Sequence, residues 1–213
     1  MKERPILMSA PMVKALLDGR KTQTRRVMKS QPYTLRTEGF GYGTKSGGFV
    51  SIQSPHCLAE FPYGVPGDRL WVREAWTSGY RDGAWGTIFR ADETFLIGKC
   101  AHEKGPHFHA KEMGSHILWR PSIFMPRWAS RITLEVTDVR VQRLQEISEG
   151  DAVAEGIYRN SENMGAGWRY SDAEPVYAFA ASAYRELWES IHGAGSSTLN
   201  PWVWAVGFKV VVA

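Results

Sequence analysis

Cysteine and long apolar runs are scarce in this chain of 213 residues. Its two cysteines, Cys57 and Cys100, are too few for a disulfide framework, which favours a reducing compartment. The longest apolar run falls far short of a membrane span. The polar start and the interruption of the first apolar stretch by Pro11 and Lys14 argue against a signal peptide. We therefore expect a cytoplasmic protein with no membrane partner.

The sequence also lacks the signatures of several large enzyme classes. It has no G-x-G-x-x-G after a predicted strand, no P-loop and no H-E-x-x-H. The sequence therefore gives no motif support for a dinucleotide enzyme, a nucleoside-triphosphate enzyme or a zincin. Some side chains could ligate zinc, but their spacing matches no recognised finger or knuckle: His56, Cys57, Cys100, His102, His107 and His109. We expect no metal site and no organic cofactor.

Charge of one sign does not dominate the chain, whereas aromatic residues are abundant. Lys and Arg total 26 against 22 for Asp and Glu, which gives a net charge of +4. This mild excess permits a nucleic-acid or phosphate-bearing partner without demanding one. Nine Trp accompany eight Tyr and nine Phe. Such a composition indicates a heavily aromatic core or a site that stacks flat rings.

The residue patterns indicate short strands with a few helices. They predict helices over 11–18, 148–155 and 177–191, and strands over 69–76, 86–92, 132–141 and 201–210. The Gly-, Ser- and Pro-rich stretch 30–67 is typical of hairpins or a long loop, and 98–116 looks irregular. This order favours an α+β fold built on a small barrel.

A basic segment with two hydroxyls follows the first predicted helix. It carries four cations in seven residues, Arg20, Lys21, Arg25 and Arg26, together with Thr22 and Thr24. A nucleophilic threonine needs a base, and a lysine serves as one only if burial or neighbouring cations lower its pKa. A continuous strand would put Lys21 and Thr24 on opposite faces, so their cooperation requires a bend after Gly19. The alternative is a solvated basic strand.

Cations and aromatic rings also alternate in the segment 119–131. Three Arg lie among two Trp and a Phe, a mixture that binds phosphates and stacks on bases. An equally plain interpretation is a Pro-braced loop whose aromatics fill the core and whose Arg stems cover it. Elsewhere, Glu155 follows Ala152, Val153 and Ala154, so its carboxylate is a candidate to point inward at a cation.

At these residues the sequence resembles the ASCH domain family of the PUA-like superfamily. Residues 16–26 resemble the family's opening signature, 67–72 its Gly-Asp strand, 132–157 the next strand and short helix, and 202–211 the closing strand. The overall pattern is also similar to uncharacterised ASCH-like proteins of phages and prophages. The resemblance implies one domain over 1–213, a small PUA-like β-barrel with flanking helices, with insertions at roughly 30–62 and 76–128.

Small bacterial members of this family include an N4-acetylcytidine amidohydrolase. That resemblance implies a catalytic set of Lys21 as base, Thr24 as nucleophile and Glu155 as its assistant, acting on a small nucleoside. Backbone N–H groups after Gly19 would bind the oxyanion. Further residues expected to bind substrate are Arg20, Arg26, Trp71, Trp76, Arg127 and Trp128. The alternatives are a non-catalytic module that binds RNA or single-stranded nucleic acid, and a ribonuclease.

Overall fold

The computed structural model describes residues 1–35, 39–43, 49–52, 61–81, 84–97, 119–160, 167–171 and 175–212. Its helices are α1 (Ala10–Leu17), α2 (Glu149–Ala154) and α3 (Ala180–His192). The main strands are β1 (Glu3–Leu7), β2 (Gln23–Val27), β6 (Arg69–Arg73), β10 (Thr133–Arg143) and β13 (Trp202–Val212). The predicted α+β class is confirmed. Each helix in the described ranges is too short or too polar to cross a membrane.

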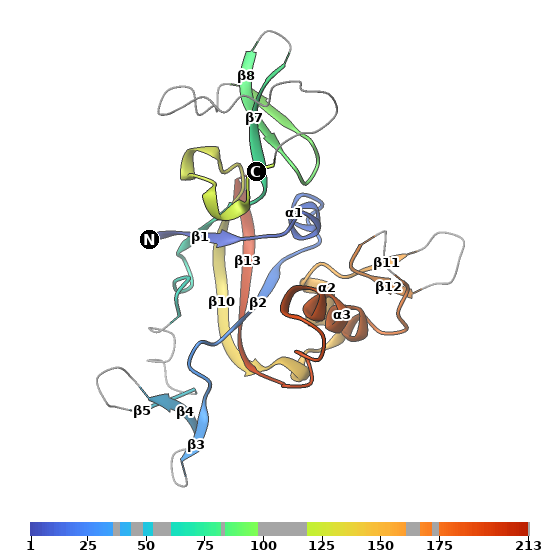
Figure 1. The fold of residues 1–213 in the computed structure, drawn as a ribbon. Coiled ribbons are helices and arrows are strands. Elements are labelled where there is room, and N and C mark those ends of the chain that lie inside the picture. Colours follow the sequence, from blue (N-terminus) through green and yellow to red (C-terminus); the bar gives the residue numbers. More distant parts are fainter. Residues whose placement is uncertain are drawn as a thin grey trace.

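The five main strands form one mixed sheet in the order β1-β6-β10-β13-β2 (Figure 1). β1 runs parallel to β6, and the remaining neighbours are antiparallel. The two edge strands approach each other, since Arg26 on β2 donates from Nη2 to the Leu7 carbonyl of β1 at 2.5 Å. A flat sheet would hold these edges roughly 19 Å apart, four strand spacings. The sheet therefore curls, and a side chain bridges its edges.

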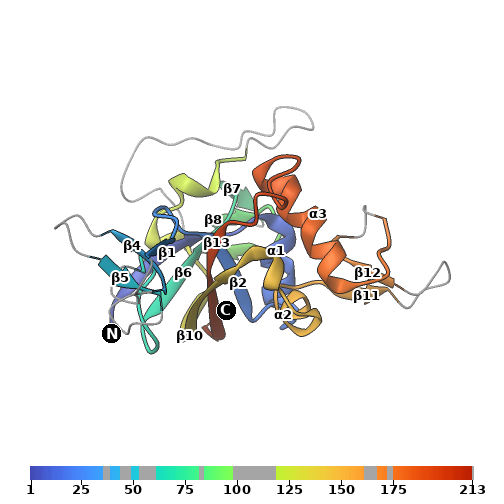
Figure 2. The same ribbon diagram turned by 90° about the horizontal axis from the view of Figure 1, so that it is seen from below.

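Both faces of β13 are covered. Trp204 and Val206 pack with Ile6 and Leu16 in one buried cluster, whereas Val203 packs on the other face. That second cluster includes buried residues of α2 and α3. Figure 2 shows both helices at the same end of the molecule, with β4 and β5 at the other. At β13, the curled sheet therefore has one buried cluster on its inner face and the helices on its outer face.

Small sheets branch from this centre. They are formed by β3 (Tyr33–Leu35), β4 (Gly39–Gly43) and β5 (Phe49–Ser51), by β7 (Trp76–Arg81), β8 (Ala84–Phe89) and β9 (Phe95–Ile97), and by β11 (Tyr158–Asn160) and β12 (Gly167–Arg169). Short 3₁₀ turns follow at η3 (Ser122–Phe124), η4 (Arg127–Ala129) and η5 (Leu144–Glu146). The first two of these sheets lie in the predicted insertions and project to opposite ends of the molecule in Figure 1.

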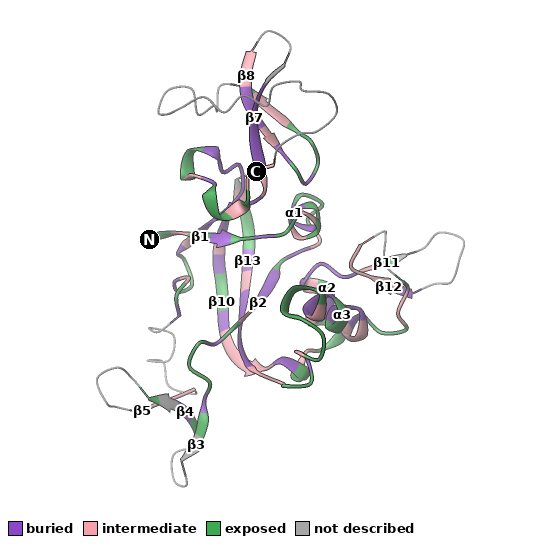
Figure 3. Ribbon diagram, viewed as in Figure 1, coloured by how far each residue is buried: buried purple, intermediate pink, exposed green. Residues whose placement is uncertain are grey.

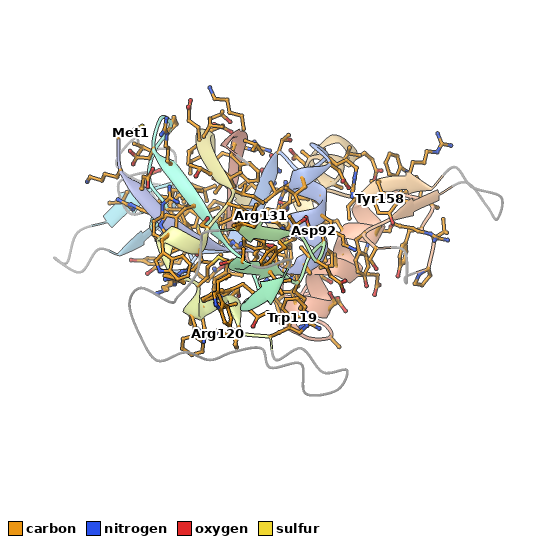
Figure 4. The ribbon with its side chains drawn as sticks, turned by 90° about the horizontal axis from the view of Figure 1, so that it is seen from above. Met1, Asp92, Trp119, Arg120, Arg131 and Tyr158 are labelled. Carbon is orange, nitrogen blue, oxygen red and sulfur yellow. The ribbon has the colours of Figure 1, made fainter. Side chains whose placement is uncertain are left out.

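One buried arginine ties the β7–β9 sheet to the central sheet. Arg131 donates to both oxygens of Glu74 at 2.9 and 3.0 Å and to both oxygens of Asp92 at 2.8 and 3.0 Å. Its guanidinium also lies 4.1 Å from the ring centre of Phe89. Burial raises the pKa of the Glu74 carboxyl, while Arg131 opposes that rise. Figure 4 shows Arg131 beside Asp92 near the middle of the molecule.

The third helix begins later than the sequence pattern predicts. Tyr177 exchanges backbone hydrogen bonds with Trp168 at 2.8 and 2.9 Å, so this residue belongs to a β-bridge. The helix starts at Ala180, where the Glu149 carboxylate accepts from the N–H groups of Ala180 and Ala181 at 2.7 and 3.1 Å. A carboxylate from another helix thus satisfies N–H groups that have no partner inside α3.

We predict that Gly156→Ala destabilises the protein more than Gly19→Ala. Both glycines have positive φ, +102° and +70°, which costs an L-residue about 1–2 kcal/mol. Only at 156 would the added methyl group also meet Ala15 Cβ at 2.9 Å; at 19 it meets nothing within 4 Å. We expect urea unfolding to show a loss of about 3 kcal/mol for Gly156→Ala and about 1 kcal/mol for Gly19→Ala. Equal losses would show that the close approach costs nothing.

Candidate active site

A turn at the end of α1 leads into the basic segment, which contacts α1 and α2 before it continues as strand β2. Gly19 has a φ of +70°, which reverses the chain after the helix. The N–H groups of Arg20 and Lys21 then both donate to the Ala15 carbonyl at 2.9 Å, and Thr22 N–H donates to the Ala154 carbonyl at 2.8 Å. These bonds overturn the expectation that backbone N–H groups after Gly19 are available to an oxyanion.

Lys21 and Glu155 form a fully buried ion pair. Lys21 Nζ lies 2.8 Å from Glu155 Oε2 and 2.7 Å from the Glu155 carbonyl oxygen. The exposed fractions of the two side chains are 0% and 1%. Burial lowers the pKa of the Lys21 ammonium; Glu155 works against this, and Arg26 and Arg25 add to it. The Glu155 carboxylate therefore points inward at a cation, as its apolar surroundings in the sequence indicate.

Further charges extend this pair into a network between β2, β10 and α2. Arg25 donates to Glu155 Oε1 at 3.1 Å and to Asp151 Oδ2 at 3.1 Å, and Arg140 donates to Asp151 Oδ1 at 2.6 Å. The Arg25 guanidinium also lies 5.7 Å from the ring centre of Tyr184 on α3. Burial and the nearby Glu155 charge raise the pKa of the Tyr184 hydroxyl well above its usual range.

One buried donor beside the pair has no acceptor in the described part of the chain. It is Arg25 Nε, which belongs to a residue only 3% exposed. Buried donors are almost always satisfied, so unpaired ones need an explanation. A ligand oxygen is one partner that such groups accept.

Thr24 lies on the same strand but on its other face. Its neighbours Gln23 and Arg25 turn toward Arg140 and Glu155, and strand alternation directs Thr24 the opposite way. Thr24 pairs with Val206 of β13 and is 1% exposed, and Figure 3 colours this part of β2 as buried. In the described chain no hydrogen bond joins its hydroxyl to Lys21 or Glu155. The bend at Gly19 precedes Lys21, so it does not bring Thr24 to the strand face on which Lys21 lies.

The two other basic residues of this segment have different positions. Arg20 is half-buried, donates to the Gly156 carbonyl at 2.9 Å and to Asp18 at 2.7 Å, and lies 4.7 Å from the ring centre of Tyr158. Arg20 therefore lies next to the Lys21–Glu155 pair, because the carbonyl it binds belongs to Gly156, the residue after Glu155. Arg26 instead bridges the sheet edges at Leu7.

The remaining predicted binding residues form a separate cluster. Trp71 and Trp76 are 8% and 1% exposed, so neither ring is placed to stack on a ligand in this structure. Trp76 packs edge-on against Trp128 at 5.7 Å, and Trp128 keeps 37% of its surface exposed. Arg127 pairs with Glu3 at 3.0 Å. These contacts involve β1, β6 and β7 rather than α2.

The histidines and cysteines considered for zinc lie outside the described residues: His56, Cys57, Cys100, His102, His107 and His109. Within the described ranges, no group of three or more His, Cys, Asp or Glu side chains is placed to hold a metal.

Sequence reasoning missed the partners Asp151 and Tyr184. A signal for Asp151 is present, because it lies four residues before Glu155 and so shares a face of α2. The alternation of Lys21, Gln23 and Arg25 supplies the matching polar face on the strand. Tyr184 has no comparable local signal, since only tertiary packing brings α3 to this site.

Comparisons with known proteins add little to this geometry. No family model matches the chain, and no curated protein matches it. Among solved structures, the chain is similar to the crystal structure of an ASCH domain from Lactobacillus crispatus JV V101, with 10% identity and a TM-score of 0.40. That alignment covers 100% of this chain and 81% of the other.

We predict that Glu155→Gln destabilises the protein far more than Asp151→Asn. The first change leaves the buried cation Lys21 without a counter-charge, which costs about 3–5 kcal/mol. Asp151 is 21% exposed and its partner Arg140 is 39% exposed, while its other partner Arg25 keeps Glu155, so the cost of the second change is about 1 kcal/mol. Urea unfolding at pH 7 measures both. Similar losses for the two variants would contradict the burial argument.

Proposed function

We propose that this chain is an ASCH-type amidohydrolase that removes the acyl group from N4-acylated cytidine or a related nucleoside. The observation that carries the proposal is the buried Lys21–Glu155 pair, in which burial and two arginines lower the pKa of a lysine. A lysine with a lowered pKa is suited to accept and return a proton near neutral pH. The unpaired donor Arg25 Nε beside it supplies a polar group for a substrate oxygen.

In this mechanism, a neutral Lys21 amine keeps a lone pair while its two N–H bonds point to the Glu155 carbonyl and carboxylate. Thr24 Oγ1 forms a bond to the amide carbon, and its proton passes to Lys21. The C–N bond then breaks, Lys21 returns the proton to the departing N4 amine, and an acyl-threonine remains. Water hydrolyses that ester by the same proton route. Arg25 Nε stabilises the oxyanion in both steps.

The mechanism requires two movements. The Lys21 and Glu155 side chains are 0% and 1% exposed, so a substrate reaches them only if the surrounding elements open. Thr24 lies on the opposite strand face, so its hydroxyl meets Lys21 only if the start of β2 twists when substrate binds. Because Thr24 is at the second position of the strand, such a twist breaks few ladder bonds.

We predict that the native chain releases cytidine from N4-acetylcytidine and that Thr24→Ala and Lys21→Met reduce kcat by about 10²–10⁴-fold. Thr24→Ser should retain activity because it keeps the hydroxyl. Thr22→Ala is the matched control, since Thr22 is exposed and contributes its backbone rather than its side chain. The measurement is chromatographic detection of cytidine, with circular dichroism to verify folding. Full activity in Thr24→Ala or no activity in the native chain would refute the mechanism.

A second function, nucleic-acid binding, is favoured by the exposed part of segment 119–131. Phe124 is 70% exposed and Trp128 37%, and the side chain of Arg127 is 45% exposed. Exposed rings beside arginines bind single-stranded nucleic acid by stacking and charge. This surface is separate from the Lys21–Glu155 pair, so the two functions can be tested independently.

For this second function, we predict salt-dependent binding of single-stranded RNA that weakens about tenfold in Phe124→Ala and Arg127→Ala. Thr24→Ala should bind like the native chain. Fluorescence anisotropy with a labelled oligonucleotide at two salt concentrations measures the affinity, and gel electrophoresis of the same RNA detects cleavage by a ribonuclease. Binding that is unchanged in both surface variants would exclude this segment.

A further inference from the structure

A cavity of 310 Å³ opens beside α1, on the side of the β11–β12 hairpin. This volume is in the range of small-molecule sites, roughly 300–1,000 Å³. Its polar and aromatic lining comes from four separate parts of the chain: Lys14, Arg20, Arg90, Tyr158, Tyr170 and Ser171. Figure 4 places Tyr158 on the hairpin side of the molecule, away from Arg131 and Asp92. The cavity lining includes none of Trp71, Trp76 and Trp128, whereas its residues Arg90 and Ala91 directly precede Asp92, a partner of Arg131.

Positive charge dominates this cavity. Arg20 is paired with Asp18, whose carboxylate lies 2.7 Å away and is 55% exposed. Lys14 and Arg90, in contrast, have no acidic partner among the residues that the structure describes. The lining thus holds three cations, and one acid lies at the edge of the group. An anion with several oxygens is the ligand that such a set attracts, and salt will weaken the attraction.

Aromatic groups accompany the cations. The Arg20 guanidinium is stacked 4.7 Å from the ring centre of Tyr158, and Tyr170 lines the same cavity. Tyrosine rings next to guanidinium planes are the groups that stack on nucleobases. Cations and aromatic surfaces within one cavity match a ligand that has both a phosphate and a flat base.

The cavity is linked to the Lys21–Glu155 pair through α2's end. Arg20 donates to the Gly156 carbonyl at 2.9 Å, and Lys21 donates to the Glu155 carbonyl at 2.7 Å, so adjacent peptide units hold the two side chains. A second, much smaller cavity of 10 Å³ shares Pro11 and Tyr170 with the first and is lined by Glu155 and Gly156. Its volume is close to that of one water probe.

We infer that this cavity binds the phosphate of a cytidine nucleotide, so that the substrate is a phosphorylated nucleoside rather than a free one. The inference rests on the proposed function for the identity of the base. Lys14 and Arg90 contact the phosphate, and Tyr158 provides a ring for the nucleoside. The phosphate comes either from a mononucleotide or from the 5′ end of an RNA chain.

The test compares cytidine 5′-monophosphate with cytidine in titration calorimetry of the native full chain, which hydrolyses neither compound because neither carries an acyl group. We expect the nucleotide to bind at least tenfold more tightly than the nucleoside, and the combined change Lys14→Gln and Arg90→Gln to abolish that difference. Arg159→Gln is the matched control, because Arg159 is an exposed arginine next to Tyr158 whose strand position faces the other way. It should bind like the parent.

Two further arms separate the possible outcomes. A short RNA with a 5′-phosphate, compared with the same RNA without it, shows whether the phosphate belongs to a chain end. Hydrolysis by the native chain tests the proposed function separately, with N4-acetylcytidine and N4-acetylcytidine 5′-monophosphate both offered as substrates. Phosphate-dependent binding without hydrolysis would sustain this inference and refute the proposed function. If neither the mononucleotide nor the RNA gains affinity from its phosphate through Lys14 and Arg90, the inference is wrong.

Discussion

Lys21 and Glu155 are held 2.8 Å apart with almost no access to water, and much of the surrounding structure depends on that contact. A charge removed from water is tolerated only with a counter-charge and hydrogen bonds. The turn at Gly19 fixes Lys21 to α1, α2 presents Glu155, and Gly156 allows α1 to approach at that point. The helices and β2 therefore have one relative position that satisfies the pair.

Such a pair is a poor way to gain stability, since apolar residues of similar size often do as well or better. Burial lowers the pKa of the Lys21 ammonium and Glu155 raises it, so these two opposing effects together set the proton affinity of the lysine. Arg25 adds a second cation to the same carboxylate, so the lysine has a competitor for the negative charge. The arrangement is expensive for folding and useful for proton transfer, which is the physical reason to interpret it as a site.

Local patterns allowed the sequence to predict elements whose signals are short-range. Ser148 caps α2 as expected, with its hydroxyl accepting from Asp151 N–H at 3.0 Å, and the apolar alternation from Ile132 onward became β10. The predicted start of α3 was wrong, because the first N–H groups of that helix are bound by the Glu149 carboxylate of another helix, which no local pattern indicates. At the candidate site, the inward carboxylate of Glu155 was predictable from its apolar helix. The occupied N–H groups after Gly19 were not, because their acceptors belong to α1 and α2.

The face of Thr24 shows how a correct rule of strand geometry limits a motif. Alternation joins Lys21, Gln23 and Arg25 on the helix side and leaves Thr24 with the curled sheet. A motif read along the chain treats lysine and threonine as neighbours, but the sheet separates them. Any chemistry that uses both must therefore include a change in β2. Since β2 is an edge strand paired only to β13 in the described chain, a twist of its first residues breaks ladder bonds to one neighbour only.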